Sequence, residues 1–182
     1  MSYTEIYKFN KEGDAIFYDE VKNSHRGAMA VWCHLEKKYL PSLSKPENYW
    51  WSAKENEYNS RTIVYSSGDN NPMNEIWSLD KSDKLTIHEK ISLSTTFDNV
   101  VVKKENIPII IEAFNNFGFE TSLPEQAKIL EKLLDDDDCI AVAWNQTSIN
   151  GDAWERQDID DETDEIIPYN LNYCDKHWFL FK

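Results

Sequence analysis

The chain has 182 residues, of which 41% are hydrophobic, and a formal net charge of −14 with a sequence pI of about 4.6. This length predicts a single domain, 1–182, with a core large enough to need no metal or disulfide. Seven Trp, nine Tyr and eight Phe argue against overall disorder. The acidic balance disfavours direct binding of nucleic acid or of anionic membranes and favours a basic partner.

The N-terminal region predicts a β-hairpin followed by a helix. Thr4 to Phe9 and Ala15 to Val21 have β-type composition, and the five residues between them include a glycine, as hairpin loops often do. Asn23-Ser24 is a predicted helix cap and Pro41 a predicted stop. Between them, apolar residues recur at helical spacing: Ala28, Val31, Trp32, Leu35 and Tyr39.

The middle of the chain is less regular. Residues 42–73 are rich in Ser, Asn, Pro and Glu, contain Trp50-Trp51 and predict a long irregular connection. The β-branched run Val100 to Val102 predicts a strand. An apolar stripe then predicts a helix, with Pro108 in its first turn and Gly118 as its stop.

The C-terminal third predicts one helix and two strands. Ser122-Leu123-Pro124-Glu125 has the pattern of a capping box with proline early in the helix. Cys139 to Trp144 predicts a buried strand, and His177 to Phe181 predicts a closing strand. Together these elements indicate an α+β fold, with a mostly antiparallel sheet and three or so helices packed on it.

Charge is concentrated in the acidic segment 135–165, where twelve carboxylates and one base, Arg156, give −11 of the net −14. Asp135 to Asp138 follow a predicted helix, where negative charge opposes the helix dipole by about 0.3–1 kcal/mol. One interpretation is a soluble helix stop before a strand. The other is a docking surface for a basic partner.

The second part of the segment interleaves acids with Trp154, Ile159 and Ile166. A flexible, solvated loop is one interpretation. In a strand, Asp158, Asp160 and Glu162 would instead share a face at intervals of about 6.5–7 Å, a row that could imitate a phosphate backbone. The predicted partner-binding residues are these acids with two aromatic anchors: Asp152, Glu155, Asp158, Asp160, Asp161, Glu162, Asp164, Glu165, Trp144 and Trp154.

Recognisable catalytic and metal-binding patterns are missing from the sequence. No glycine-rich phosphate loop and no Gly-x-Ser-x-Gly elbow occurs. An EF-hand starting at Asp158 fails, because its sixth position is Thr163 and its twelfth is Tyr169. Cys174 and His177 supply only one pair for zinc. No cofactor, metal or catalytic residue is therefore predicted, although converging carboxylates keep a metal-dependent enzyme as an alternative.

The compartment is predicted from the cysteines and the first residues. Cys33, Cys139 and Cys174 are an odd number at scattered spacing, typical of reduced cytosolic thiols. The first residues resemble no signal peptide, and apolar runs such as Ile107 to Ile111 are too short to span a membrane. A cytoplasmic protein is expected.

Several strings resemble a known group of proteins: Gly27 to Trp32, Thr95 to Asp98, Ala141 to Ser148 and Gly151 to Trp154. The chain resembles small acidic proteins encoded by phages and prophages of low-GC Gram-positive bacteria, among which are anti-CRISPR inhibitors of Cas9. The resemblance implies an inhibitor in the bacterial host cell that presents carboxylates to a basic groove of a nucleic-acid-handling enzyme, most specifically Cas9 with its guide RNA. The alternative is a structural or regulatory phage protein whose acids only keep it soluble.

Overall fold

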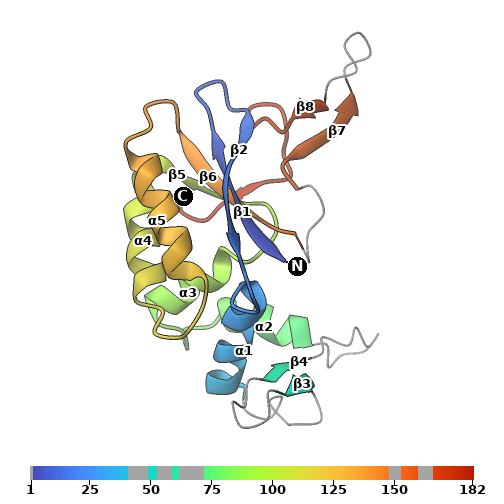
Figure 1. Ribbon diagram of the computed structural model, residues 1–182, viewed down its shortest axis with the longest axis vertical. Helices are drawn as coiled ribbons and strands as arrows, with labels where there is room; N and C mark the ends of the chain where they lie inside the picture. The colour runs from blue at the N-terminus through green and yellow to red at the C-terminus, as the bar shows by residue number, and fades with distance from the viewer. Residues whose placement is uncertain (1, 41–48, 53–58, 62–71, 148–152, 160–165) are drawn as a thin grey trace.

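A computed structural model describes residues 2–40, 49–52, 59–61, 72–147, 153–159 and 166–182. A five-stranded sheet has the order β2-β1-β6-β5-β9 and is antiparallel except for the β5–β9 pair (Figure 1). The strands of this sheet are β1 (Tyr3–Phe9), β2 (Ala15–Lys22), β5 (Val100–Lys103), β6 (Ala141–Gln146) and β9 (Trp178–Phe179). The predicted α+β class and mostly antiparallel sheet are confirmed.

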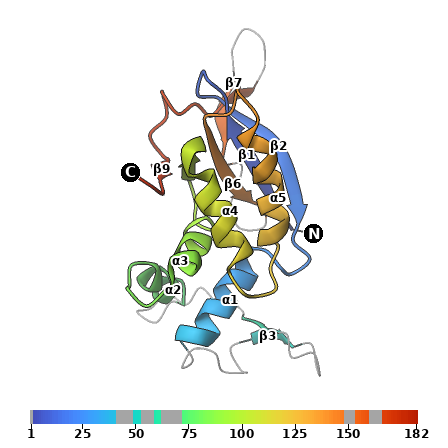
Figure 2. The ribbon, with the colours of Figure 1, turned by 90° about the vertical axis from the view of Figure 1, so that its left-hand side faces the viewer.

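Five α-helices occur in the described residues: α1 (Ala28–Tyr39), α2 (Pro72–Asp80), α3 (Ile87–Ser94), α4 (Ile107–Asn115) and α5 (Leu123–Leu134). A short 3-10 turn, η3 (Lys104–Asn106), joins β5 to α4. Helices α4 and α5 cover one face of the sheet, and α3 lies below them (Figures 1 and 2). No helix among the described residues is long and apolar enough to cross a membrane.

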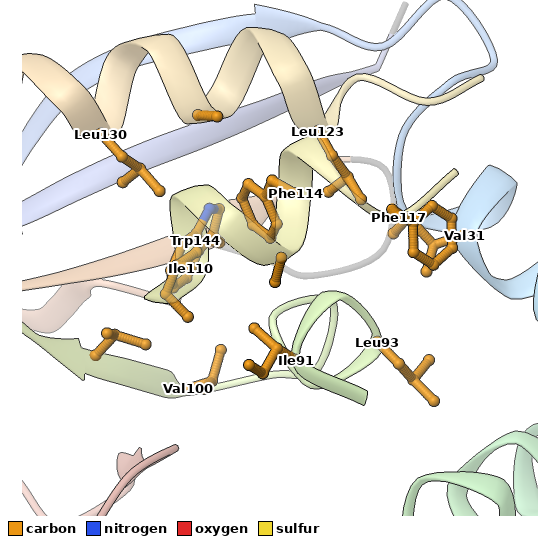
Figure 3. Close-up of a cluster of buried hydrophobic side chains, with 14 of the residues drawn as sticks. Val31, Ile91, Leu93, Val100, Ile110, Phe114, Phe117, Leu123, Leu130 and Trp144 are labelled. Atoms are coloured by element: carbon orange, nitrogen blue, oxygen red, sulfur yellow. The ribbon is translucent and has the colours of Figure 1, made fainter. Parts of the chain in front are cut away.

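The main core lies between the sheet and these helices (Figure 3). Trp144 and Val100 from the sheet meet Phe114 of α4 and Leu130 of α5 there. A second, smaller cluster lies on the opposite face of the sheet and includes Phe9, Val101, Trp154 and Tyr169. The sheet is therefore covered on both faces, which explains why all six residues of β6 are buried.

Two short hairpins accompany the main sheet. Strands β3 (Tyr49–Ser52) and β4 (Asn59–Arg61) pair antiparallel, and so do β7 (Glu155–Ile159) and β8 (Ile166–Pro168). The first pair and the start of α2 interrupt the stretch 42–73, where composition predicts irregular chain. The rest of that stretch lies outside the described residues.

Two predicted caps are wrong in detail. The residue that caps α1 is Gly27, not Asn23-Ser24, and the side chain of Asn23 instead accepts hydrogen bonds from Thr4 and Ser122. Ser122 precedes α5 as predicted but its side chain makes no capping bond. The capping box that does form is Thr86 with Glu89, at the start of α3, which the sequence did not predict.

Candidate functional site

The α5–β6 turn, which carries Asp135 to Asp138, and strand β7, which begins at Glu155, lie at the same end of the molecule, at the top of Figure 1. The turn between β1 and β2, the turn between α5 and β6, and the base of the β7–β8 hairpin meet there (Figure 1). We call this surface the acidic end. The residues whose carboxylates define it are Glu12, Asp14, Asp135, Asp136, Asp137, Asp138 and Glu155.

Lysine side chains hold the α5–β6 turn against the β1–β2 hairpin. Lys8 Nζ lies 2.7 Å from Asp136 Oδ2 and 3.6 Å from Asp138 Oδ2. Lys104 Nζ donates to the carbonyl oxygen of Asp136 at 2.8 Å, close to the end of α5. The backbone N–H of Asp138 donates to Asp136 Oδ1 at 2.9 Å. Asp136 and Asp138 therefore have structural roles, whereas Asp135 and Asp137 stay exposed.

The ion pair with Lys8 predicts a specific pH dependence. Its hydrogen bond to Asp136 holds the pKa of that carboxyl below the ordinary value of 3.8. A lowered folded-state pKa gives stability that is complete above pH 3.8 and is lost as the pH falls through the folded pKa. We expect Asp136→Asn to destabilise the protein at pH 7 and to differ less from the parent as the pH falls below 3.8. Urea unfolding at pH 7 and at pH 3 measures this, and a difference that grows at low pH would contradict it.

The β1–β2 turn also binds the segment that follows β8. Asn170 Nδ2 donates to Asp14 Oδ1 at 2.7 Å and to the carbonyl of Glu12 at 3.1 Å. The backbone N–H of Leu171 donates to the carbonyl of Gly13 at 2.8 Å. Gly13 has φ of +91°, and a Cβ there would lie 2.7 Å from Asn172 Nδ2, so both the backbone and the space require glycine. The β1–β2 hairpin therefore contacts both the α5–β6 turn, through Lys8 and Lys11, and the segment that follows β8, through Asn170.

Trp154 anchors the β7–β8 hairpin to the sheet. Its side chain is 1% exposed, and its Nε1 donates to the carbonyl of Trp144 at 2.9 Å. Its ring makes edge contacts with Phe9 and Tyr169, at centroid distances of 5.5 and 5.3 Å. Glu155, the next residue, is exposed at the base of the hairpin.

Both predicted aromatic anchors are therefore wrong as direct contacts. Trp144 is 1% exposed and packs in the core between the sheet and the helices. Trp154 packs with Tyr169 in the second cluster, on the opposite face of the sheet. Neither indole reaches the surface, because each fills one of the two cores on either side of the sheet. Trp154 can act on a partner only by holding the hairpin in place.

Only some of the predicted acids lie within the described residues. Glu155 and Asp158 lie in β7, whereas the predicted row of Asp158, Asp160 and Glu162 extends outside the described residues. Asp152, Asp160, Asp161, Glu162, Asp164 and Glu165 lie outside the described residues. The sequence did not predict the roles of Glu12 and Asp14, which lie in a hairpin loop that reaches this surface through the contacts of Asn170 and of Lys11.

The described residues hold no group of three or more His, Cys, Asp and Glu side chains that could bind a metal. Burial raises the pKa of the Cys139 thiol to about 11, so it stays protonated at neutral pH. His177 Nδ1 lies 3.0 Å from the hydroxyl of Tyr169, and burial lowers the pKa of His177. This contact links His177 of the C-terminal segment to Tyr169, which belongs to the second hydrophobic cluster.

Comparison with protein-family models, with curated proteins and with solved structures gives no match. The described residues define an α+β domain whose sheet is covered on both faces. The carboxylates of the acidic end lie at one end of this sheet. Most of these carboxylates are on turns, and those of Asp135, Asp137 and Glu155 are exposed.

Proposed function

We propose that this protein binds a basic groove of a nucleic-acid-handling host enzyme through its acidic end and inhibits that enzyme by occupying the groove. The most specific form of the proposal is a phage-encoded inhibitor of a type II CRISPR effector, Cas9 with its guide RNA. The observation that supports it is that the β1–β2 hairpin contacts both the α5–β6 turn, which carries Asp135 to Asp138, and the segment that follows the β7–β8 hairpin. The net negative charge alone would equally fit a structural or regulatory protein whose acids only keep it soluble.

The arrangement supports binding because side-chain contacts hold the described turns of the acidic end. Lys8, Asn170 and Trp154 fix these turns, so the turns would not have to be ordered when a partner binds. Strands β7 and β8 lie at this end of the molecule, beside the main sheet (Figure 1). Summed negative charge at one end also steers a basic partner toward that end, and added salt weakens this steering.

A charge-matched pair of variants tests the mechanism. We expect Asp135→Asn/Asp137→Asn/Glu155→Gln to slow association with a basic partner about tenfold or more at low salt, because these three exposed carboxylates contribute to steering. The control Asp83→Asn/Glu112→Gln/Glu120→Gln removes the same charge from exposed positions elsewhere and should change association by about twofold or less. Association rates measured by surface plasmon resonance at several salt concentrations compare the two. Equal effects of the two variants would contradict a localised surface.

Pulldown from host lysate followed by a Cas9 cleavage assay tests the partner. We expect capture of a basic protein and reduced cleavage at saturating inhibitor. Unaltered cleavage would exclude Cas9 as the target. Neutralising Asp158, Asp160, Asp161 and Glu162 to Asn or Gln without loss of binding would exclude the hairpin acids as the contact while leaving inhibition in place.

A further inference from the structure

The segment that follows β8 forms a turn whose backbone is fixed at several points. The N–H groups of Tyr173 and Cys174 both donate to the carbonyl of Asn170, at 3.3 and 2.9 Å. The N–H of Asn172 donates to Oδ1 of the same asparagine at 2.8 Å. Asn170 is only 7% exposed, so the turn is built around a buried side chain. We call residues 170–174 the tyrosine turn.

The tyrosine turn is also bonded to the β1–β2 turn. Nδ2 of Asn172 donates to the carbonyl of Glu12 at 2.9 Å, and Nδ2 of Asn170 donates to the same carbonyl at 3.1 Å. The N–H of Leu171 donates to the carbonyl of Gly13 at 2.8 Å. Because a side chain at Gly13 would collide with Asn172, this close approach depends on the glycine. The position of the tyrosine turn is therefore set by contacts on both sides of the sequence that it follows.

The side chain of Tyr173 takes no part in holding this turn. Its neighbours Leu171 and Cys174 pack against the second hydrophobic cluster, whereas Tyr173 is 82% exposed. Within the part of the chain that the structure describes, its ring makes no aromatic contact and its hydroxyl makes no hydrogen bond. The fold therefore fixes the backbone under Tyr173 and leaves the whole side chain available to a second molecule.

The tyrosine turn borders the acidic end. Glu12, whose carbonyl accepts from both asparagine side chains, has an exposed side chain and belongs to that surface. Asp175 and Lys176 follow the turn, and their charges cancel. Across the acidic end the carboxylates outnumber the lysine side chains beside them. A partner that approaches Tyr173 therefore meets a surface that is negative overall.

We propose that Tyr173 is the aromatic contact through which the acidic end binds a basic protein surface. Its ring can lie against the aliphatic stems and the charged groups of lysine and arginine side chains, and its hydroxyl can accept a hydrogen bond from them. A tyrosine on a fixed backbone loses little conformational entropy on binding, which is why such residues often dominate interfaces. The inference rests on the proposed function, because the acidic end supplies the charge that attracts the partner. It assigns to Tyr173 the contact that the buried Trp144 and Trp154 cannot make.

Titration with a peptide of nine arginines tests this contact on the ¹⁵N-labelled protein. We expect saturable shifts at the backbone amides of Tyr173 and Glu12. Tyr173→Ala should weaken binding of the peptide about fivefold or more, whereas Tyr173→Phe keeps the ring and should weaken it about twofold or less. Trp77→Ala removes an exposed aromatic side chain from α2, at the other end of the molecule, and should change binding by less than about twofold (Figure 1). Equal affinities of the parent and Tyr173→Ala would overturn the proposal.

Kinetics separate the ring contact from charge attraction. Measured by surface plasmon resonance with the same peptide, Tyr173→Ala should act mainly on dissociation and keep its effect between about 50 and 300 mM salt. The triple variant Asp135→Asn/Asp137→Asn/Glu155→Gln should act mainly on association and lose its effect over that range. An effect of Tyr173→Ala confined to association would overturn the proposal.

The same two variants distinguish failure of this inference from failure of the proposed function. If the triple variant weakens binding and Tyr173→Ala does not, the inference is wrong and the proposed function stands. If neither variant weakens binding, or if only Tyr173→Ala does, the acidic end is not the docking surface and both are wrong. Weakening by both variants, with the kinetic difference described, supports both.

Discussion

Replacing Trp154 by alanine is expected to reduce the free energy of unfolding by about 3–5 kcal/mol, the range for large aromatic residues removed from a core. The side chain is 1% exposed and touches both Phe9 and Tyr169. The substitution would also leave the carbonyl of Trp144 without its donor. Urea unfolding followed by circular dichroism measures the change.

Trp77→Ala is the matched control, because Trp77 is 52% exposed and its main ring contact is Phe97. We expect it to lower the free energy of unfolding by about 1 kcal/mol or less. The Trp154 variant should also bind a partner more weakly at temperatures where it remains folded, since the hairpin loses its anchor. A loss below about 1 kcal/mol for Trp154→Ala would show that the hairpin is not held by this contact.

Gly27→Ala is expected to destabilise the protein by about 1–3 kcal/mol through overpacking. A Cβ at this position would lie 2.4 Å from Cγ of Asn23 and 2.5 Å from its Nδ2, well inside contact distance. The Asn23 side chain cannot easily move away, because its Oδ1 accepts from Thr4 at 2.9 Å and from Ser122 at 3.3 Å. The backbone itself would tolerate alanine, since φ of Gly27 is −77°.

A double-mutant cycle isolates this contact. In an Asn23→Ala background the obstructing atoms are gone, so Gly27→Ala should cost less than about 1 kcal/mol, mostly from the poorer helix cap. The effect of alanine on the unfolded chain is common to both backgrounds and cancels. Thermal and urea unfolding of the four proteins give the coupling free energy. An equal cost of Gly27→Ala in both backgrounds would show that Asn23 is not the obstacle.

Strong local patterns predicted much of the fold. The hairpin of β1 and β2, helix α1, the strand within Val100 to Val102 and the buried strand β6 are all confirmed. Helix α4 begins at Ile107 with Pro108 in its first turn, as the apolar stripe predicts. The C-terminal strand is confirmed in a shorter form, pairing parallel to β5 at the edge of the sheet.

The helices and side-chain positions that the sequence did not predict have weak or non-local signals. Helices α2 and α3 are short, and α3 has only a modest apolar face, so their periodicity is hard to see. The buried positions of Trp144 and Trp154 follow from the order of strands, which no local pattern shows. Asn23 resembles a helix cap, yet tertiary contacts with Thr4 and Ser122 outweigh that local preference.

The amount of charge, its concentration in residues 135–165 and the α+β class can all be predicted from the amino-acid sequence alone. Composition and local periodicity carry that information, because each depends only on neighbours along the chain. The tertiary structure places the Asp135 to Asp138 turn against the β1–β2 loop, through Lys11, and the segment that follows β8 against the same loop, through Asn170. It also leaves Tyr173 exposed on a fixed turn, since hydrogen bonds between distant parts of the chain set which side chains face outward.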